Sequence, residues 1–235
     1  MTKSRYYFYQ SFRILLFIAS FLGLWLLSNQ TFSQLGKWWS IICTVINLAT
    51  ISTLLLYGKK NGMSYSEIIR YQPKTTRAKT KILGIVVVMV VGMGGMFLAG
   101  LLVYRQFPYL AKNLIEPIPY GLATLNILLL PFTTTLAEDG LYLGIGVNQS
   151  PKGKLAFIIP ALFYALQHSF IPLYFDFSYV IYRFLSFLPL TIILCYWYFK
   201  KRNPVPIMLG HFVINLATVL QIFIVSMWPI LYESM

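Results

Sequence analysis

The sequence has few charged side chains, and acidic residues and histidines are the scarcest among the ionisable ones. It contains six Asp and Glu residues and two histidines in 235 positions. Charged residues make up 11% of the chain, whereas a soluble domain carries about 25%. Hydrophobic residues make up 58% and the mean hydropathy is +0.69. This shortage of charge excludes an ordinary soluble globular protein.

Cysteine is also scarce, which limits metal and redox chemistry based on thiols. The two cysteines, Cys43 and Cys195, both lie within apolar runs and form no C-x-x-C or other ligand spacing. We interpret them as small buried hydrophobic residues.

Long apolar runs dominate the rest of the chain, and many approach the roughly 20 residues that a helix needs to cross a bilayer. Lipid offers no hydrogen-bond partner to the backbone, so such runs form helices rather than open sheets. The sequence therefore predicts an all-α protein, a polytopic transmembrane helical bundle in which residues 1–235 form a single membrane domain. We expect seven spans, or eight if the last run breaks into two helices. The predicted spans are 12–28, 38–57, 81–104, 118–147, 154–171, 178–199 and 204–231.

Basic residues give the chain a net charge of +13, and their distribution indicates membrane topology rather than nucleic-acid binding. If the N-terminus is cytoplasmic, the inside segments hold fourteen Lys and Arg residues and the outside segments hold three. The inside set is Lys3, Arg5, Lys59, Lys60, Arg70, Lys74, Arg77, Lys79, Lys81, Lys152, Lys154, Lys200, Lys201 and Arg202, and the outside set is Lys37, Arg105 and Lys112. We therefore expect an integral membrane protein with a cytoplasmic N-terminus, in contact with membrane lipid and with no nucleic-acid partner.

The N-terminal segment looks at first like a secretory signal peptide. Lys3, Arg5 and Arg13 precede the apolar residues 14–27. No small-residue cleavage site follows, and further spans do, so we interpret this segment as an uncleaved first span.

Ionisable and polar side chains occur within three of the predicted spans. Glu138 and Asp139 are adjacent in the fourth span, His168 lies in the fifth, and His211 and Asn215 lie four residues apart on one face of the seventh. Such groups are costly in lipid and by default indicate a functional site. Estimated from the helical rise, they share one range of depth, so we expect them to line one cavity that opens toward the cytoplasmic side or the inner leaflet. The plainer alternative is that these side chains only form hydrogen bonds that hold the helices together.

One further charged residue has a simpler interpretation. Arg183 lies near the outer end of the sixth predicted span, where we expect it to reach the interface or to pair with Asp176.

Three short motifs follow one another in the segment 118–220, which we treat as a motif-bearing, catalytic-like core. The stretch AEDGLYLG resembles E-E-x-x-x-R, the stretch FYALQHS resembles F-x-x-x-H, and the stretch PVPIMLGHFVINLA resembles H-x-x-x-N. In this order and on separate spans, they resemble the CAAX protease and bacteriocin-processing (CPBP/Abi) family of intramembrane glutamic endopeptidases. Three residues depart from the family pattern: Leu143 occupies the arginine position, Tyr164 the phenylalanine position and Asp139 the second glutamate position.

The resemblance implies roles for four residues. Glu138 would be the general base with His168 as its partner, while His211 and Asn215 would stabilise the oxyanion. Asp139 and Tyr164 would support them, and no cofactor would be needed. The alternative is a zinc site with Glu138, His168 and His211 as ligands, a set that matches a catalytic zinc shell, although the sequence has no H-E-x-x-H.

Three functions remain open from the sequence. The first is an intramembrane endopeptidase, a hydrolase that cleaves a peptide or a lipid-modified protein with a Glu/His-activated water, in a bacterial cell membrane. The second is a non-enzymatic bacteriocin immunity or scaffold protein with a degraded site, which Leu143 keeps open. The third is a proton-coupled transporter, in which Glu and His would form a proton relay. The chain lacks the pair of broken spans in matching halves that would support this function.

Overall fold

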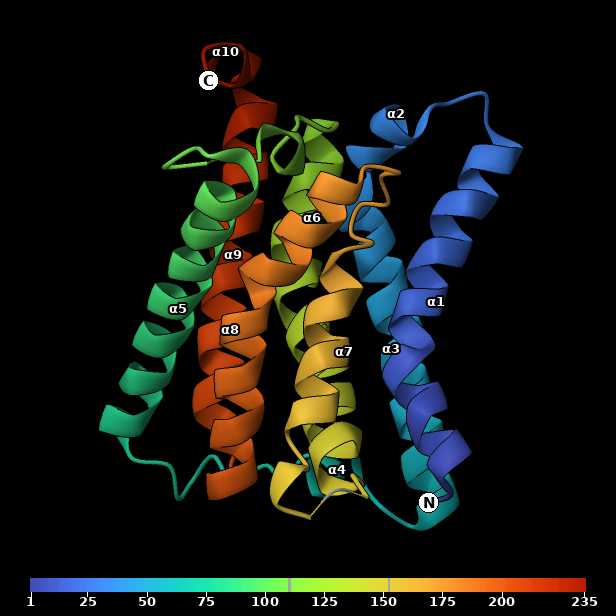
Figure 1. The fold of residues 1–235 in the computed structure, drawn as a ribbon, viewed down its shortest axis with the longest axis vertical. Coiled ribbons are helices and arrows are strands. Elements are labelled where there is room, and N and C mark those ends of the chain that lie inside the picture. The colour runs from blue at the N-terminus through green and yellow to red at the C-terminus, as the bar shows by residue number, and fades with distance from the viewer. Residues whose placement is uncertain (110, 152) are drawn as a thin grey trace.

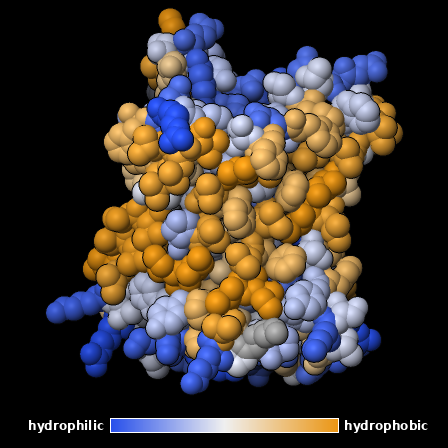
Figure 2. Space-filling model, viewed as in Figure 1, coloured by the Kyte–Doolittle hydropathy of each residue, from blue (hydrophilic) through white to orange (hydrophobic). Residues whose placement is uncertain are grey.

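The computed structural model describes residues 1–109, 111–151 and 153–235, and this part of the chain contains helices and no strand. The long helices run roughly parallel or antiparallel to one another and form one bundle (Figure 1). The predicted all-α fold is therefore confirmed. On the face that Figure 2 shows, a broad hydrophobic surface covers the middle of the bundle, with hydrophilic residues at both ends.

Among the described residues, six helices are long and apolar enough to cross a membrane. They are α1 (Lys3–Leu27), α3 (Trp39–Asn61), α5 (Ala78–Tyr104), α6 (Tyr120–Thr134) with its continuation η2 (Thr135–Val147), α8 (Phe177–Lys201) and α9 (Val205–Met227). They correspond to six of the seven predicted spans, and the first begins nine residues before its predicted start at residue 12.

The remaining predicted span, 154–171, is only partly helical. Its helix α7 (Ile158–His168) has 11 residues, which gives a length of about 16 Å against a hydrocarbon core of about 30 Å. Residues 169–176 complete the passage without regular structure, and α8 begins at the far end (Figure 1). Pro172 accounts for part of this, because proline disfavours a helix at and before its own position. The described part of the chain thus passes through the bundle seven times, on six long helices and one short one.

The last predicted span does not break into two spans. Helix α9 is followed by α10 (Pro229–Glu233), which has five residues and is too short to cross a membrane. The eight-span alternative is therefore wrong for the described residues.

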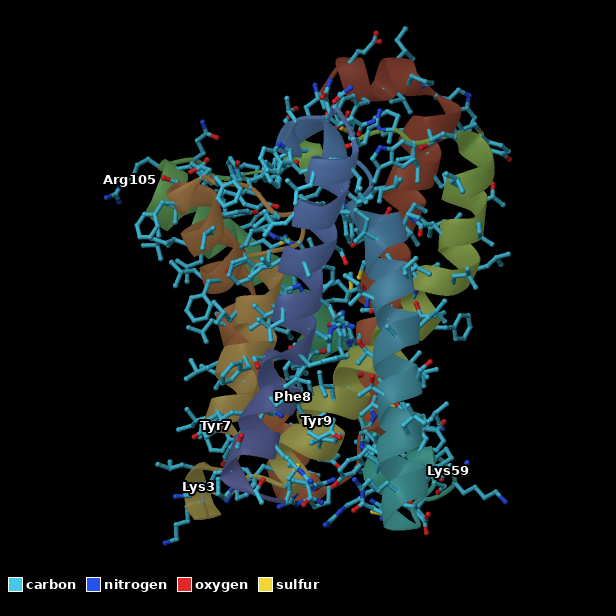
Figure 3. All side chains as sticks on the ribbon, turned by 90° about the vertical axis from the view of Figure 1, so that its right-hand side faces the viewer. Lys3, Tyr7, Phe8, Tyr9, Lys59 and Arg105 are labelled. Carbon is cyan, nitrogen blue, oxygen red and sulfur yellow. The ribbon has the colours of Figure 1, made fainter. Side chains whose placement is uncertain are left out.

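The two ends of the bundle differ in charge. Lys59 and Lys60 end α3, and Lys200 and Lys201 end α8, at the same end as α4 (Tyr65–Ile68) and η3 (Gly153–Leu155). Figure 3 shows Lys3 and Lys59 at this end and Arg105 toward the other. Helices α2 (Phe32–Gly36) and α10 and the turn η1 (Lys112–Leu114) lie at the opposite end, and the chain termini lie at opposite ends (Figure 1).

Three basic residues need separate mention. Lys152, expected in a basic loop, lies outside the described residues. Arg13 and Arg183, which belong to neither charged end, are buried inside the bundle.

Glycines in α5 allow close approach of α8 and α9. A Cβ atom at Gly84 would collide with the backbone carbonyl of Pro206 in α9, and one at Gly95 with that of Ser186 in α8. A Cβ atom at Gly94 would meet no atom within 4 Å. Close packing therefore depends on Gly84 and Gly95, whereas Gly94 faces outward.

Candidate active site

The two adjacent carboxylates lie on a π-helix. Helix α6 continues past Pro131, and at Thr135 its hydrogen bonding changes to the π pattern of η2. A π-helix has i→i+5 hydrogen bonds and often occurs at functional sites. Its wider turn reduces the angle between successive side chains, which lets both Glu138 and Asp139 point into the bundle. Their exposed fractions are 1% and 0%.

Glu138 joins three other helices. Its Oε1 atom accepts a hydrogen bond from Nη2 of Arg13 in α1 at 2.8 Å, as an ion pair. Its Oε2 atom lies 3.5 Å from Nε2 of His211 in α9 and 3.9 Å from Nε2 of His168 in α7. Oε2 has no hydrogen-bond partner among the described residues. One carboxylate oxygen is thus held by a cation, and the other faces two imidazoles.

Asp139 and Tyr164 support His211 from the opposite side of its ring. The Tyr164 hydroxyl donates to Oδ1 of Asp139 at 3.1 Å and lies 3.1 Å from Nδ1 of His211. Nδ1 of His211 also lies 3.4 Å from Oδ1 of Asp139. If Nδ1 carries its proton toward this pair, Nε2 is the ring nitrogen left to face Glu138. The ring of His168 stacks on Phe187 with 3.6 Å between ring centres.

Asn215 lies one turn after His211 and is half-buried. Its Nδ2 atom donates to the backbone carbonyl of His211 at 2.9 Å, which uses one of its two N–H groups. The second N–H group remains for another acceptor.

One cavity of about 290 Å³ adjoins these residues. Glu138, His168, His211 and Asn215 all line it, together with Tyr164. The expectation that the four residues converge is therefore confirmed in geometry. The rest of the wall is largely apolar and comes mainly from α5, α8 and α9.

The direction of the cavity differs from our expectation. Its lining extends to Trp39 at the start of α3 and to Tyr109 and Leu114 in the segment between α5 and α6. These residues lie at the end with α2 and α10, away from the basic end (Figure 1). The lining includes no residue of the loops at the basic end, so it does not support an opening there, while the alternative of a lateral opening into the inner leaflet stays a prediction. The expectation rested on depths counted along the helices, which do not say on which side of the polar group space remains.

The sequence did not identify Arg13 as part of the site. We assigned it to the charged start of the first span, but it lies about 15 Å into α1 and is fully buried. Its position could have been found from helical spacing, because Gln10, Arg13, Phe17 and Phe21 follow one helical face and all are buried.

Arg183 does not pair with Asp176. Asp176 caps the start of α8 through the backbone N–H groups of Ser178 and Tyr179. Arg183 instead donates to the backbone carbonyls of His168 and Ile171 at 3.3 and 3.1 Å and lines the cavity. It thereby satisfies one carbonyl at the end of α7 and one in the irregular segment that follows, which lipid could not do.

Two observations bear on the zinc alternative, which stays a prediction. No group of three or more His, Cys, Asp or Glu side chains that could hold a metal occurs in the described part of the chain. Arg13 also places a positive charge on the Glu138 carboxylate at 2.8 Å, and this charge would repel a divalent cation.

The fold and this site define a multi-pass helical membrane protein with a buried carboxylate–histidine group. Residues 120–217 match the family model described as type II CAAX prenyl endopeptidase Rce1-like. This segment lies within residues 118–220 and contains all three motifs, so the match confirms the resemblance that they indicated. No match was found among curated proteins or among solved structures.

Proposed function

We propose that the protein is an intramembrane endopeptidase in which Glu138 and His168 activate a water molecule. The observation that carries this proposal is the position of Glu138 Oε2, which faces both Nε2 atoms on the wall of one cavity. The Rce1-like match supports a protease of the CAAX type.

The mechanism follows from the different surroundings of the two carboxylate oxygens of Glu138. Arg13 occupies Oε1, so Oε2 is the atom that can take a proton from water. The hydroxide attacks the scissile carbonyl carbon, and the proton passes to the leaving amine. Nε2 of His211 in its protonated form and the remaining N–H of Asn215 donate to the oxyanion.

The cavity indicates an apolar substrate segment. Its volume of about 290 Å³ and its largely apolar wall suit a short apolar peptide or part of a lipid-modified residue. We propose a peptide or lipidated protein as substrate and a bacterial cell membrane as the location. With a cytoplasmic N-terminus, the substrate would reach the site from the outer side.

The test is cleavage of a farnesylated CAAX peptide with a fluorophore and a quencher on either side of the prenylated cysteine. The purified protein in lipid nanodiscs should release the quencher, and Glu138→Gln should lower kcat at least about 10³-fold, because the amide cannot accept the proton. Glu116→Gln, outside the cavity, is the matched control and should cleave normally. Equal cleavage by the Glu138→Gln variant would refute the proposal.

The competing function is a bacteriocin immunity or scaffold protein with a degraded site. Leu143 at the arginine position is the observation that favours it. A protein that binds the probe but never cleaves it, before and after Leu143→Arg, would support this alternative.

A further inference from the structure

Arg13 supplies a cation to the carboxylate pair from a helix outside the segment that carries the family motifs. It lies in α1, more than 100 residues before the matched segment 120–217. Helix α1 packs against α3, α7 and η2 and lies beside α3 in the bundle (Figures 1 and 3).

The guanidinium of Arg13 is held on all sides. Its Nε donates to Gln167 at 2.6 Å, its Nη1 to Asn47 at 2.8 Å and to Thr50 at 3.2 Å, and its Nη2 to Glu138 at 2.8 Å. Four hydrogen bonds from a planar, fixed fork leave little freedom of orientation. Because the guanidinium is fixed, the Glu138 carboxylate that it binds is also held in a defined position.

Gln167 connects this cation to the first histidine. It precedes His168 directly in α7, and its Oε1 atom also accepts from the hydroxyl of Tyr142 in η2 at 3.2 Å. Arg13 thus ties the helix that carries His168 to the helix that carries Glu138.

Leu143 occupies the position at which the family motif has an arginine. It lies five residues after Glu138 in a helix with i→i+5 bonding, so the two positions are about one turn apart. Leu143 is fully buried in a hydrophobic cluster with Leu141 and Ile145, so no charge comes from this position.

We infer that Arg13 stands in for the motif arginine as the positioning residue of Glu138. It compensates the charge of the buried carboxylate and occupies Oε1, so that Oε2 is directed to the histidines. The site is then complete despite Leu143. This inference rests on the proposed peptidase function.

The test is a double-variant cycle with the same farnesylated probe. Arg13→Gln should lower kcat about 10²-fold through misplacement of Glu138, with KM within about threefold because the cavity wall is unchanged. Arg13→Lys should be intermediate, because an ammonium keeps the charge without the planar fork. Arg5→Gln, exposed on the same helix, should cleave normally.

The Leu143→Arg substitution should change kcat in a way that a purely structural role of Arg13 would not produce. In the otherwise unchanged protein it should lower cleavage, since Arg13 already neutralises Glu138 and a second buried cation would compete for the oxygen that faces the histidines. Combined with Arg13→Gln it should raise kcat at least about tenfold above Arg13→Gln alone, because one cation is restored. Thermal unfolding of each variant identifies any that fails to fold, and for such a case Arg13→Lys carries the comparison.

Two failures are distinguishable. If the unchanged protein cleaves and a folded Arg13→Gln variant cleaves equally well, Arg13 is not a positioning residue and the inference is wrong. A folded double variant no faster than Arg13→Gln would also overturn it. If neither the unchanged protein nor any variant cleaves, the proposed function itself fails.

Discussion

At the scale of single residues, the site depends on which atoms of each side chain are already engaged. Oε1 of Glu138 is bound by Arg13, and Nδ1 of His211 lies against Asp139 and Tyr164. The atoms left over, Oε2 and the two Nε2 nitrogens, face one another beside the cavity. The chemistry we propose uses these remaining atoms.

Asn215 offers a prediction at this scale. Asn215→Ala removes one proposed oxyanion donor and should lower kcat by about 10²–10³ with KM nearly unchanged. Asn126→Ala removes another buried amide, which donates to Ser40 at 2.7 Å away from the cavity. The control should lower the unfolding temperature without lowering kcat. A raised KM with normal kcat in Asn215→Ala would show a binding role instead.

At the scale of elements, two irregular features place the site. The π-helix η2 turns both carboxylates inward. Helix α7 ends at His168, and the carbonyls of His168 and of Ile171 in the segment that follows accept hydrogen bonds from Arg183. A regular α-helix in place of η2 would not direct both carboxylates inward, and a longer α7 would not leave free carbonyls for Arg183.

The contact of α5 with α8 gives a stability prediction. Gly95→Ala forces a methyl group against the carbonyl of Ser186 and should lower the free energy of unfolding by about 1–3 kcal/mol. Gly94→Ala, one residue earlier with open space at the Cβ position, should cause no loss. Thermal unfolding in the same detergent measures both, and equal effects would contradict the assignment of Gly95 to the interface.

At the scale of the whole molecule, the basic end and the cavity lie on opposite sides of the polar group. From the positive-inside rule we propose that the basic end is cytoplasmic. With that orientation the cavity would face the outer side, and substrates would enter from there.

Cysteine labelling tests this orientation. In a background without Cys43 and Cys195, both buried, a membrane-impermeant maleimide applied to intact cells should label Arg105→Cys. It should label Lys59→Cys only after permeabilisation. The reverse pattern would invert the topology and the proposed side of substrate entry.

Much of this arrangement could be predicted from the sequence because hydropathy and charge act locally. Six spans, the charge difference between the ends and the meeting of Glu138 with His168 and His211 follow from runs, loops and motifs. Arg13, the π-helix and the short α7 could not be predicted in this way. They depend on contacts between distant segments, such as the ion pair of Arg13 with Glu138. The motif alone suggested that a charge is missing at Leu143.

The most direct test of the central claim is the turnover of the farnesylated probe after metal removal. If Glu138 and the histidines act on water directly, dialysis against 1,10-phenanthroline should leave kcat unchanged, and added zinc should not raise it. Glu138→Gln should remain inactive under both conditions. Loss of cleavage on chelation, restored by zinc, would contradict the account and assign Glu138, His168 and His211 as metal ligands.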